Sequence, residues 1–149
     1  MAKIRLTKEF GFETAHSLLG YDGLCKNIHG HSYKLFVTVR GEPINDTQNP
    51  KNGMVMDFGD LKKIVKSQIV DIFDHAYVVN SAENIEKLKN LNSLFDRHII
   101  CDYQPTCENM VADFAEKIKK QLPKNINLVS IKLHETATSY AEWFAQDNE

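Results

Sequence analysis

The chain lacks any long hydrophobic run, and this absence limits the classes of protein to which it can belong. No apolar stretch approaches the roughly 18 residues of a membrane span, and the opening MAKIRL lacks the apolar core of a signal peptide. Cysteines number only three, and an odd number without an extracellular address favours reduced thiols. We therefore expect a cytoplasmic protein without a membrane partner, with Cys101 and Cys107 as small core residues.

An excess of charge of one sign is also missing. The 149 residues carry 18 basic and 20 acidic side chains, and a net charge of −2 argues against a broad nucleic-acid footprint. An anionic small molecule would have to be held by locally placed cations. Internal repeats, low-complexity tracts and a clear domain boundary are absent too, so we expect a single domain over residues 1–149.

What the sequence does contain is a histidine pattern typical of a metal site. In the run CKNIHGH, which begins at Cys25, His29 and His31 lie two residues apart, so a strand would turn both imidazoles to one face. A third histidine, His16, lies near the end of an alternating segment that begins at Phe10. Antiparallel pairing of the two segments would make His16 and His29 neighbours. Three neutral imidazoles are the protein share of a catalytic Zn²⁺ site with an open fourth position.

Two other interpretations of these residues stay open. Each histidine alone would more commonly be a hydrogen-bonded, partly buried residue than a ligand, although the joint spacing reverses that preference. Cys25 could also act as a fourth ligand, which would give a closed Cys-His₃ structural site that serves folding alone. Acid–base groups elsewhere in the chain argue against a closed site, because such a site would not need them.

Hydrophobic periodicity predicts an α+β fold in which helices cover one face of a four-stranded antiparallel sheet, in the order ββααββ. Strands are predicted over residues 3–16, 31–42, about 127–135 and 138–144. The second strand turns its histidines and its apolar side chains to the same face: Tyr33, Leu35, Val37 and Val39. The metal-bearing face is therefore predicted to be the packed face.

Helices are predicted where the apolar period lengthens. Asp57 is expected to cap a helix with the apolar stripe Phe58, Leu61, Ile64, Val65, Ile69, Ile72 and Phe73. Thr106 is expected to cap another, which Pro123 ends. A short amphipathic piece around Ile85, Leu88 and Leu91 predicts a further helix.

A series of short motifs follows a fixed order along about residues 4 to 140. These are FETAH ending at His16, CKNIHGH, GMVMDFGDLK from Gly53, Asp74-His75, PTCEN from Pro105, and His134-Glu135-Thr136. In this order they resemble the 6-pyruvoyltetrahydropterin synthase superfamily. The three-residue spacer before the His-Gly-His unit resembles that of its bacterial 6-carboxy-5,6,7,8-tetrahydropterin synthases of queuosine biosynthesis.

The resemblance implies a tunnelling fold, in which three subunit sheets join into a barrel and two trimers stack into a homohexamer. It also implies conversion of 7,8-dihydroneopterin triphosphate to 6-carboxy-5,6,7,8-tetrahydropterin, with release of triphosphate and acetaldehyde. His16, His29 and His31 would hold Zn²⁺ as a Lewis acid for the substrate side chain. Cys25 would abstract a proton from that side chain, and active sites would lie at subunit interfaces.

Further site residues follow from the other motifs. Asp74 and His75 resemble the family's catalytic pair, in which a carboxylate fixes the imidazole tautomer and raises its basicity. Thr106 and Glu108 are candidates for contact with the pterin, and Glu108 would equally suit the first turn of a helix.

Glu135 continues a predicted apolar strand face that consists of Val129, Ile131 and Leu133. A charge there is costly unless a donor matches it, and the adjacent N–H groups of a pterin would satisfy a carboxylate. The alternative is that Glu135 emerges into solvent at the strand end. The resemblance favours the pterin anchor.

Three other functions stay open at this point. The first is the sister reaction that makes 6-pyruvoyltetrahydropterin from the same substrate, although its eukaryotic enzymes usually have a longer spacer after the cysteine. The second cleaves the side chain to a hydroxymethylpterin and usually has a glutamate in place of Cys25. The third is a non-catalytic, zinc-stabilised binding module, which would need Cys25 as a ligand and no role for Glu135.

Overall fold

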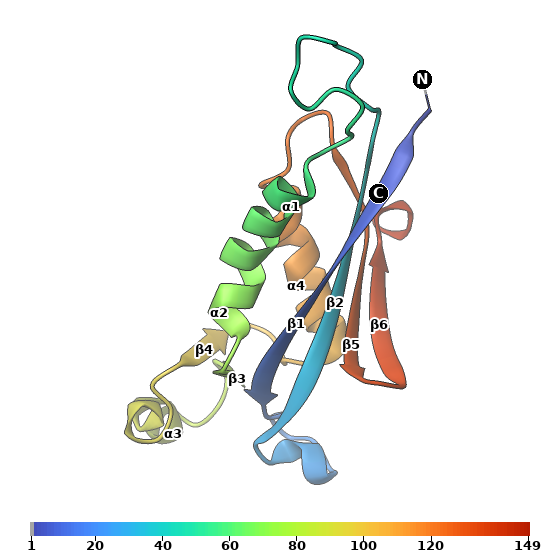
Figure 1. Cartoon of the computed structure of the whole chain (residues 1–149). Helices are drawn as coiled ribbons and strands as arrows, with labels where there is room; N and C mark the ends of the chain where they lie inside the picture. Colours follow the sequence, from blue (N-terminus) through green and yellow to red (C-terminus); the bar gives the residue numbers. More distant parts are fainter. Residues whose placement is uncertain (1) are drawn as a thin grey trace.

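A curled six-stranded sheet forms the centre of the computed structural model, which describes residues 2–149 (Figure 1). The strands are β1 (Ile4–His16), β2 (His29–Gly41), β3 (Ala76–Asn80), β4 (His98–Cys101), β5 (Asn127–Thr136) and β6 (Ser139–Phe144), in the spatial order β4-β3-β1-β2-β5-β6. The pairs β1–β2, β2–β5 and β5–β6 are antiparallel, whereas β3 is parallel to β1 and β4 is parallel to β3.

The predicted sheet is therefore wrong in the number of its strands: the four predicted strands pair antiparallel, as expected, but two further strands join in parallel and make the sheet mixed. The two missing strands are the short segments AYVVN (β3) and HIIC (β4). Neither shows the polar alternation of a half-buried strand, and a short apolar run cannot be told from a helix segment by its period. The four longer strands lie where the sequence predicts them, within two residues at each end.

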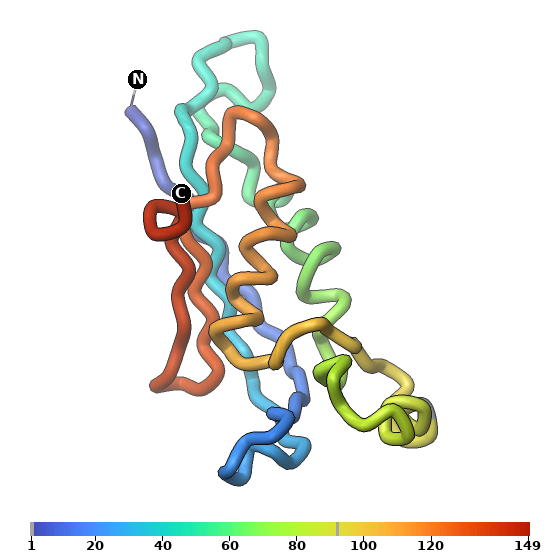
Figure 2. The backbone as a smooth tube through the Cα atoms, turned by 180° about the vertical axis from the view of Figure 1, so that it is seen from behind, coloured from blue at the N-terminus to red at the C-terminus, as the bar shows by residue number. Residues whose placement is uncertain are grey.

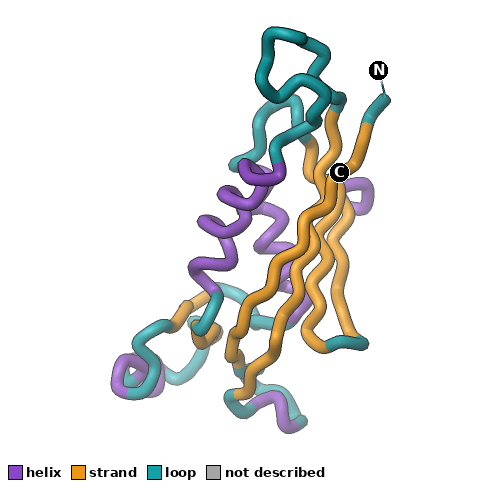
Figure 3. Tube along the Cα trace, viewed as in Figure 1, coloured by secondary structure: helices purple, strands orange, loops and turns teal. Residues whose placement is uncertain are grey.

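The helices are α1 (Phe58–Val65), α2 (Asp71–Phe73), α3 (Ile85–Lys89) and α4 (Cys107–Lys119), and a π-helical turn, Lys66–Val70, joins the first two. The predicted order ββααββ becomes β1-β2-α1-α2-β3-α3-β4-α4-β5-β6. α1, α2 and α4 cover one face of the sheet (Figure 3), and from behind α4 lies beside the α1–α2 segment (Figure 2). No helix among residues 2–149 has the length and apolarity needed to cross a membrane.

Both predicted helix caps are confirmed. The Asp57 carboxylate accepts a hydrogen bond from Gly59 N at 2.7 Å, and the Thr106 hydroxyl accepts one from Asn109 N at 3.3 Å. The predicted apolar stripe is wrong at its margins, because Phe58 and Ile72 are 50% and 44% exposed. The fully buried positions, Leu61, Val65, Ile69 and Phe73, are four residues apart, so a side chain three residues from one of them lies at the edge of the stripe.

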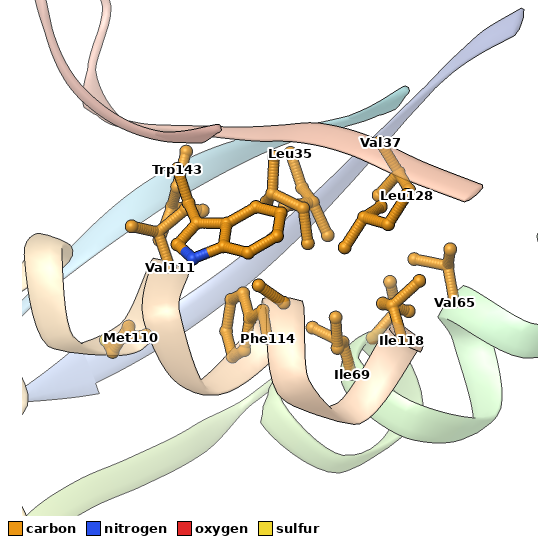
Figure 4. Close-up of a cluster of buried hydrophobic side chains, with 14 of the residues drawn as sticks. Leu35, Val37, Val65, Ile69, Met110, Val111, Phe114, Ile118, Leu128 and Trp143 are labelled. Atoms are coloured by element: carbon orange, nitrogen blue, oxygen red, sulfur yellow. The ribbon is translucent and has the colours of Figure 1, made fainter. Parts of the chain in front are cut away.

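The core lies between this helical layer and the sheet (Figure 4). Leu35 and Val37 of β2 face Phe114 and Ile118 of α4, and all four are fully buried. Tyr33 and Val39 are buried on the same face of β2, as predicted. Cys101 of β4 and Cys107 of α4 are also buried, as predicted. Because the core fixes the face of β2, it also fixes the direction of the histidines at the start of that strand.

Candidate metal centre and active site

Three histidines come together where β1 ends and β2 begins. His16 and His29 are paired residues of the β1–β2 ladder, which confirms the predicted cross-strand neighbours, and His31 follows on the same face. One ring nitrogen from each of the three lies within 4.8 Å of the others. Among residues 2–149 this is the one such group of histidine, cysteine and carboxylate side chains. The three residues could therefore hold a metal ion.

Backbone carbonyls orient two of these imidazoles. His16 Nδ1 lies 2.6 Å from the carbonyl oxygen of Pro105, and His29 Nδ1 lies 2.8 Å from that of Asn27. A carbonyl oxygen can only accept a hydrogen bond, so each Nδ1 carries the proton and each Nε2 keeps a free lone pair. An oriented imidazole whose other nitrogen donates to a carbonyl is the usual arrangement of a metal-ligating histidine.

The electrostatics of the cluster also fit a bound cation. Burial lowers the pKa of His16 and of His31, so both favour the neutral form that can ligate a metal. The Nε2 atoms of both are buried without a hydrogen-bond partner in the described chain, and Glu135 Oε1 lies 3.4 Å and 3.6 Å from them. A carboxylate oxygen that faces two imidazole lone pairs needs a cation or a donor between them.

Glu135 reaches this position because of a β-bulge. His134 pairs with Tyr140 and Thr136 with Ser139, which leaves Glu135 as an extra residue in β5. A bulge redirects a side chain, and here it places the carboxylate beside the histidines, 28% exposed.

A second irregularity in β5 corrects the predicted apolar face. Thr38 pairs with Ser130 and Val39 with Leu128, so the intervening Val129 is the extra residue. Leu128 takes its place in the buried face, beside Ile131 and Leu133.

Cys25 lies in a 3₁₀ turn, Leu24–Lys26, just before β2, and is half-buried. Its thiol is not part of the histidine group, which argues against the closed Cys-His₃ site.

Gln104, which lies before α4, holds the loop between β1 and β2. Its side-chain amide donates to Leu19 O at 2.8 Å and accepts from Leu19 N at 3.1 Å. Leu18 N in turn donates to Cys25 O at 3.0 Å. A lone glutamine carries no sequence pattern that predicts such a role.

In the folded protein we expect one reactive thiol per chain, that of Cys25. Burial raises the pKa of Cys107 to about 11 and raises that of Cys101, and the thiolate is the form that attacks. A disulfide reagent at pH 8 should therefore react quickly with one thiol and with the other two only after denaturation. Cys25→Ser should abolish the fast phase, and fast reaction of a second thiol in the native protein would contradict this assignment.

Asp74 and His75 follow α2 and do not contact the three histidines. Asp74 Oδ1 accepts a hydrogen bond from Glu13 N at 2.9 Å and lies 3.8 Å from His75 Nε2, and the His75 side chain is 76% exposed. A cavity of about 580 Å³ is lined by both His31 and His75, so one residue of the pair and one of the cluster border the same space.

The PTCEN motif has a clear structural task. The Thr106 hydroxyl is the cap of α4, and the carbonyl of Pro105 orients His16. Glu108 is exposed in the first helical turn, where a carboxylate is favourable. Neither Thr106 nor Glu108 contacts the histidine cluster in the described structure.

Comparison with known proteins shows similar sequences and similar folds. The sequence profile of the family described as 6-pyruvoyl tetrahydropterin synthase matches residues 5–146. A 6-carboxy-5,6,7,8-tetrahydropterin synthase of Haemophilus influenzae is 36% identical, over 93% of this chain and 97% of that protein, and one of Synechocystis is 30% identical over 93% and 91%. The structure of Caenorhabditis elegans 6-pyruvoyl tetrahydropterin synthase has a TM-score of 0.68 at 26% identity and covers 97% of each chain. The fold is shared by an uncharacterised Wolinella succinogenes protein, which is 18% identical. Its TM-score is 0.78, and the match covers 97% of this chain and 99% of that chain.

Proposed function

Because the chain belongs to the 6-pyruvoyl tetrahydropterin synthase family, we propose that it converts 7,8-dihydroneopterin triphosphate and water to 6-carboxy-5,6,7,8-tetrahydropterin, triphosphate and acetaldehyde. The observation that carries the proposal is the cluster of His16, His29 and His31 with the Glu135 carboxylate beside it. The relatives named for this reaction support the choice of product. The product is a precursor of queuosine.

Each residue has a task that its position supports. Glu135, whose carboxylate lies beside His16 and His31, accepts hydrogen bonds from the N–H groups of the pterin ring. Cys25, in the turn that precedes β2, removes a proton from the substrate side chain, and His75 with Asp74 carries protons to and from solvent. Thr106 and Glu108 border the pterin from the start of α4.

His16, His29 and His31 would hold Zn²⁺, for which three imidazoles with a free tetrahedral position are a typical catalytic set. When bound, zinc would supply Lewis-acid polarisation of the substrate's side-chain oxygens. The chain's own contribution is to fix the three rings, since Pro105 O and Asn27 O hold two of them in the ligating tautomer.

A second copy of the chain is the expected protein partner, in a trimer or a hexamer. β1 pairs with β3 only over Thr14–His16, so residues 4–13 leave one edge of β1 without a neighbour in the described chain. β6 is the last strand at the other side of the sheet. Unpaired strand edges favour pairing with another chain, and pairing of β1 with β6 of a neighbour would close the sheets into a barrel.

Product identification tests the proposal. Zinc-loaded protein incubated with 7,8-dihydroneopterin triphosphate should yield 6-carboxy-5,6,7,8-tetrahydropterin by mass spectrometry, with an equal amount of acetaldehyde. A pyruvoyl product without acetaldehyde would assign the sister reaction, which the family description and the C. elegans neighbour keep as the second candidate. No turnover with zinc bound would leave the site as a binding module.

A further inference from the structure

The backbone around Asp74 and His75 is held in an uncommon conformation. α2 ends at Phe73, Asp74 is extended with ψ 125°, and His75 has φ 61°. Among residues 2–149, His75 is the one non-glycine residue with a positive φ. A residue in this region is retained only when its surroundings hold it there, and such conformations gather at functional sites. The contacts that hold this turn therefore decide where the imidazole points.

One side of the turn is fixed by β1. His75 N donates to Glu13 O at 2.6 Å, and Glu13 N donates to the Asp74 carboxylate at 2.9 Å. The Thr14 hydroxyl donates to Phe73 O at 2.8 Å. These bonds fix the inner side of the turn but leave the last carbonyls of the helix, which have no partner within it, facing outward.

Arg97 occupies the outer side. Its Nη2 lies 2.8 Å from Asp71 O, 3.2 Å from Ile72 O and 3.0 Å from Asp74 O. One amino group therefore donates to three carbonyl oxygens at the end of α2. Its own carbonyl accepts a hydrogen bond from Tyr77 N at 3.0 Å. The turn from Asp71 to Tyr77 is thus bonded to Arg97 at both ends.

The positive charge of Arg97 also lies at the C-terminal end of α2. None of the ion pairs recorded over residues 2–149 includes it, so its guanidinium is balanced by carbonyl dipoles at a helix C-terminus, where a cation is favourable. Arg97 also lines the cavity that His31 and His75 share. It borders the reacting space without contacting the histidine cluster.

We propose that Arg97 is a positioning residue, which fixes the Asp74–His75 turn and so aims the His75 imidazole at the substrate. The inference rests on the proposed function, because it gives His75 a proton to move. All three contacts are made by one amino group, so the reach and the permanent charge of the arginine provide the restraint, and the shorter lysine would supply only part of it. A glutamine would lose the charge and reach fewer of the three oxygens.

Two measurements on Arg97→Gln test this role. In zinc-loaded protein, kcat should fall about tenfold with KM within twofold, since a displaced acid–base group slows the reaction without removing substrate contacts. Hydrogen exchange of a peptide covering residues 70–77 should be about tenfold faster, with exchange in β2 and α4 unchanged. Arg97→Lys should recover part of both effects. Lys124→Gln, which removes an exposed cation with no recorded ion pair, is the control and should change neither.

The outcomes separate this proposal from the reaction itself. Unchanged kcat and unchanged exchange in Arg97→Gln would overturn it, and faster exchange over the whole chain would reduce Arg97 to a residue of general stability. Faster exchange confined to residues 70–77 in Arg97→Gln, together with a wild-type protein that turns over no pterin, would support the restraint and would refute the proposed function. The zinc content and molecular mass of each variant should equal those of the wild type.

Discussion

Replacement of His31 by alanine should release the metal ion while the fold remains. Residues that only orient a ligand are worth about 10- to 100-fold in metal affinity, so removal of a ligand should weaken binding by at least about 100-fold. The fold should survive because His31 lies outside the hydrophobic core and forms no hydrogen bond recorded in residues 2–149. Metal analysis after equilibration at a fixed free zinc concentration should give near one ion per wild-type chain and almost none in His31→Ala.

Thermal unfolding supplies an independent measure of the same loss. A ligand at about 100 times its Kd stabilises the folded state by about 2.7 kcal/mol. Zinc at that concentration should raise the Tm of the wild type by several degrees. In His31→Ala, where the affinity is at least about 100-fold weaker, it adds at most about 0.4 kcal/mol and should raise the Tm far less. In the absence of metal the two proteins should unfold at similar temperatures, because the apo site loses no hydrogen bond.

His98→Ala provides the matched control. His98 is a half-buried histidine of β4 whose Nδ1 bonds to Phe95 O, and it lies outside the histidine cluster. This variant should bind zinc as the wild type does. Wild-type zinc content in His31→Ala would mean that the three histidines are not the metal site.

The parts of the fold that the sequence could predict are those where the periodic signal is long. β2 alternates over 13 residues, and its buried face, with Tyr33, Leu35 and Val37, lies where the pattern puts it. The caps at Asp57 and Thr106 are local and were equally predictable. β3 and β4 depend on parallel pairing with distant partners, and a run of four or five residues holds too little signal to reveal that.

The candidate site also has a part that the sequence could predict and a part that it could not. The spacing of His29 and His31 and the end of the β1 segment at His16 predicted a cluster, because a strand fixes side-chain direction by parity. Its supports could not be predicted, since Pro105 and Asn27 act through backbone carbonyls, which every residue has. The place of Glu135 depends on a bulge at the end of β5, where only Thr136 follows, so the strand is too short beyond it for a shift in the alternation to be recognised.

Cys25→Ala should retain zinc and lose turnover, and this combination is what distinguishes a base from a ligand. Because the Cys25 thiol lies outside the group formed by the three histidines, its removal leaves every ligand in place. A positioned acid–base group contributes about 10²- to 10⁴-fold to a rate, so kcat should fall by that factor. Product formation from 7,8-dihydroneopterin triphosphate and zinc content should be measured on the same preparation.

The matched control is Cys101→Ala, which removes a buried thiol bonded to Val79 O and Tyr103 O and should cost stability rather than turnover. Cobalt substitution adds a direct view of the ligands, since a thiolate on cobalt produces a sulfur-to-metal charge-transfer band. The wild type should lack that band, in agreement with a three-histidine set. A band in the wild type that disappears in Cys25→Ala, together with loss of metal, would instead make the site a closed Cys-His₃ centre and remove Cys25 from the chemistry.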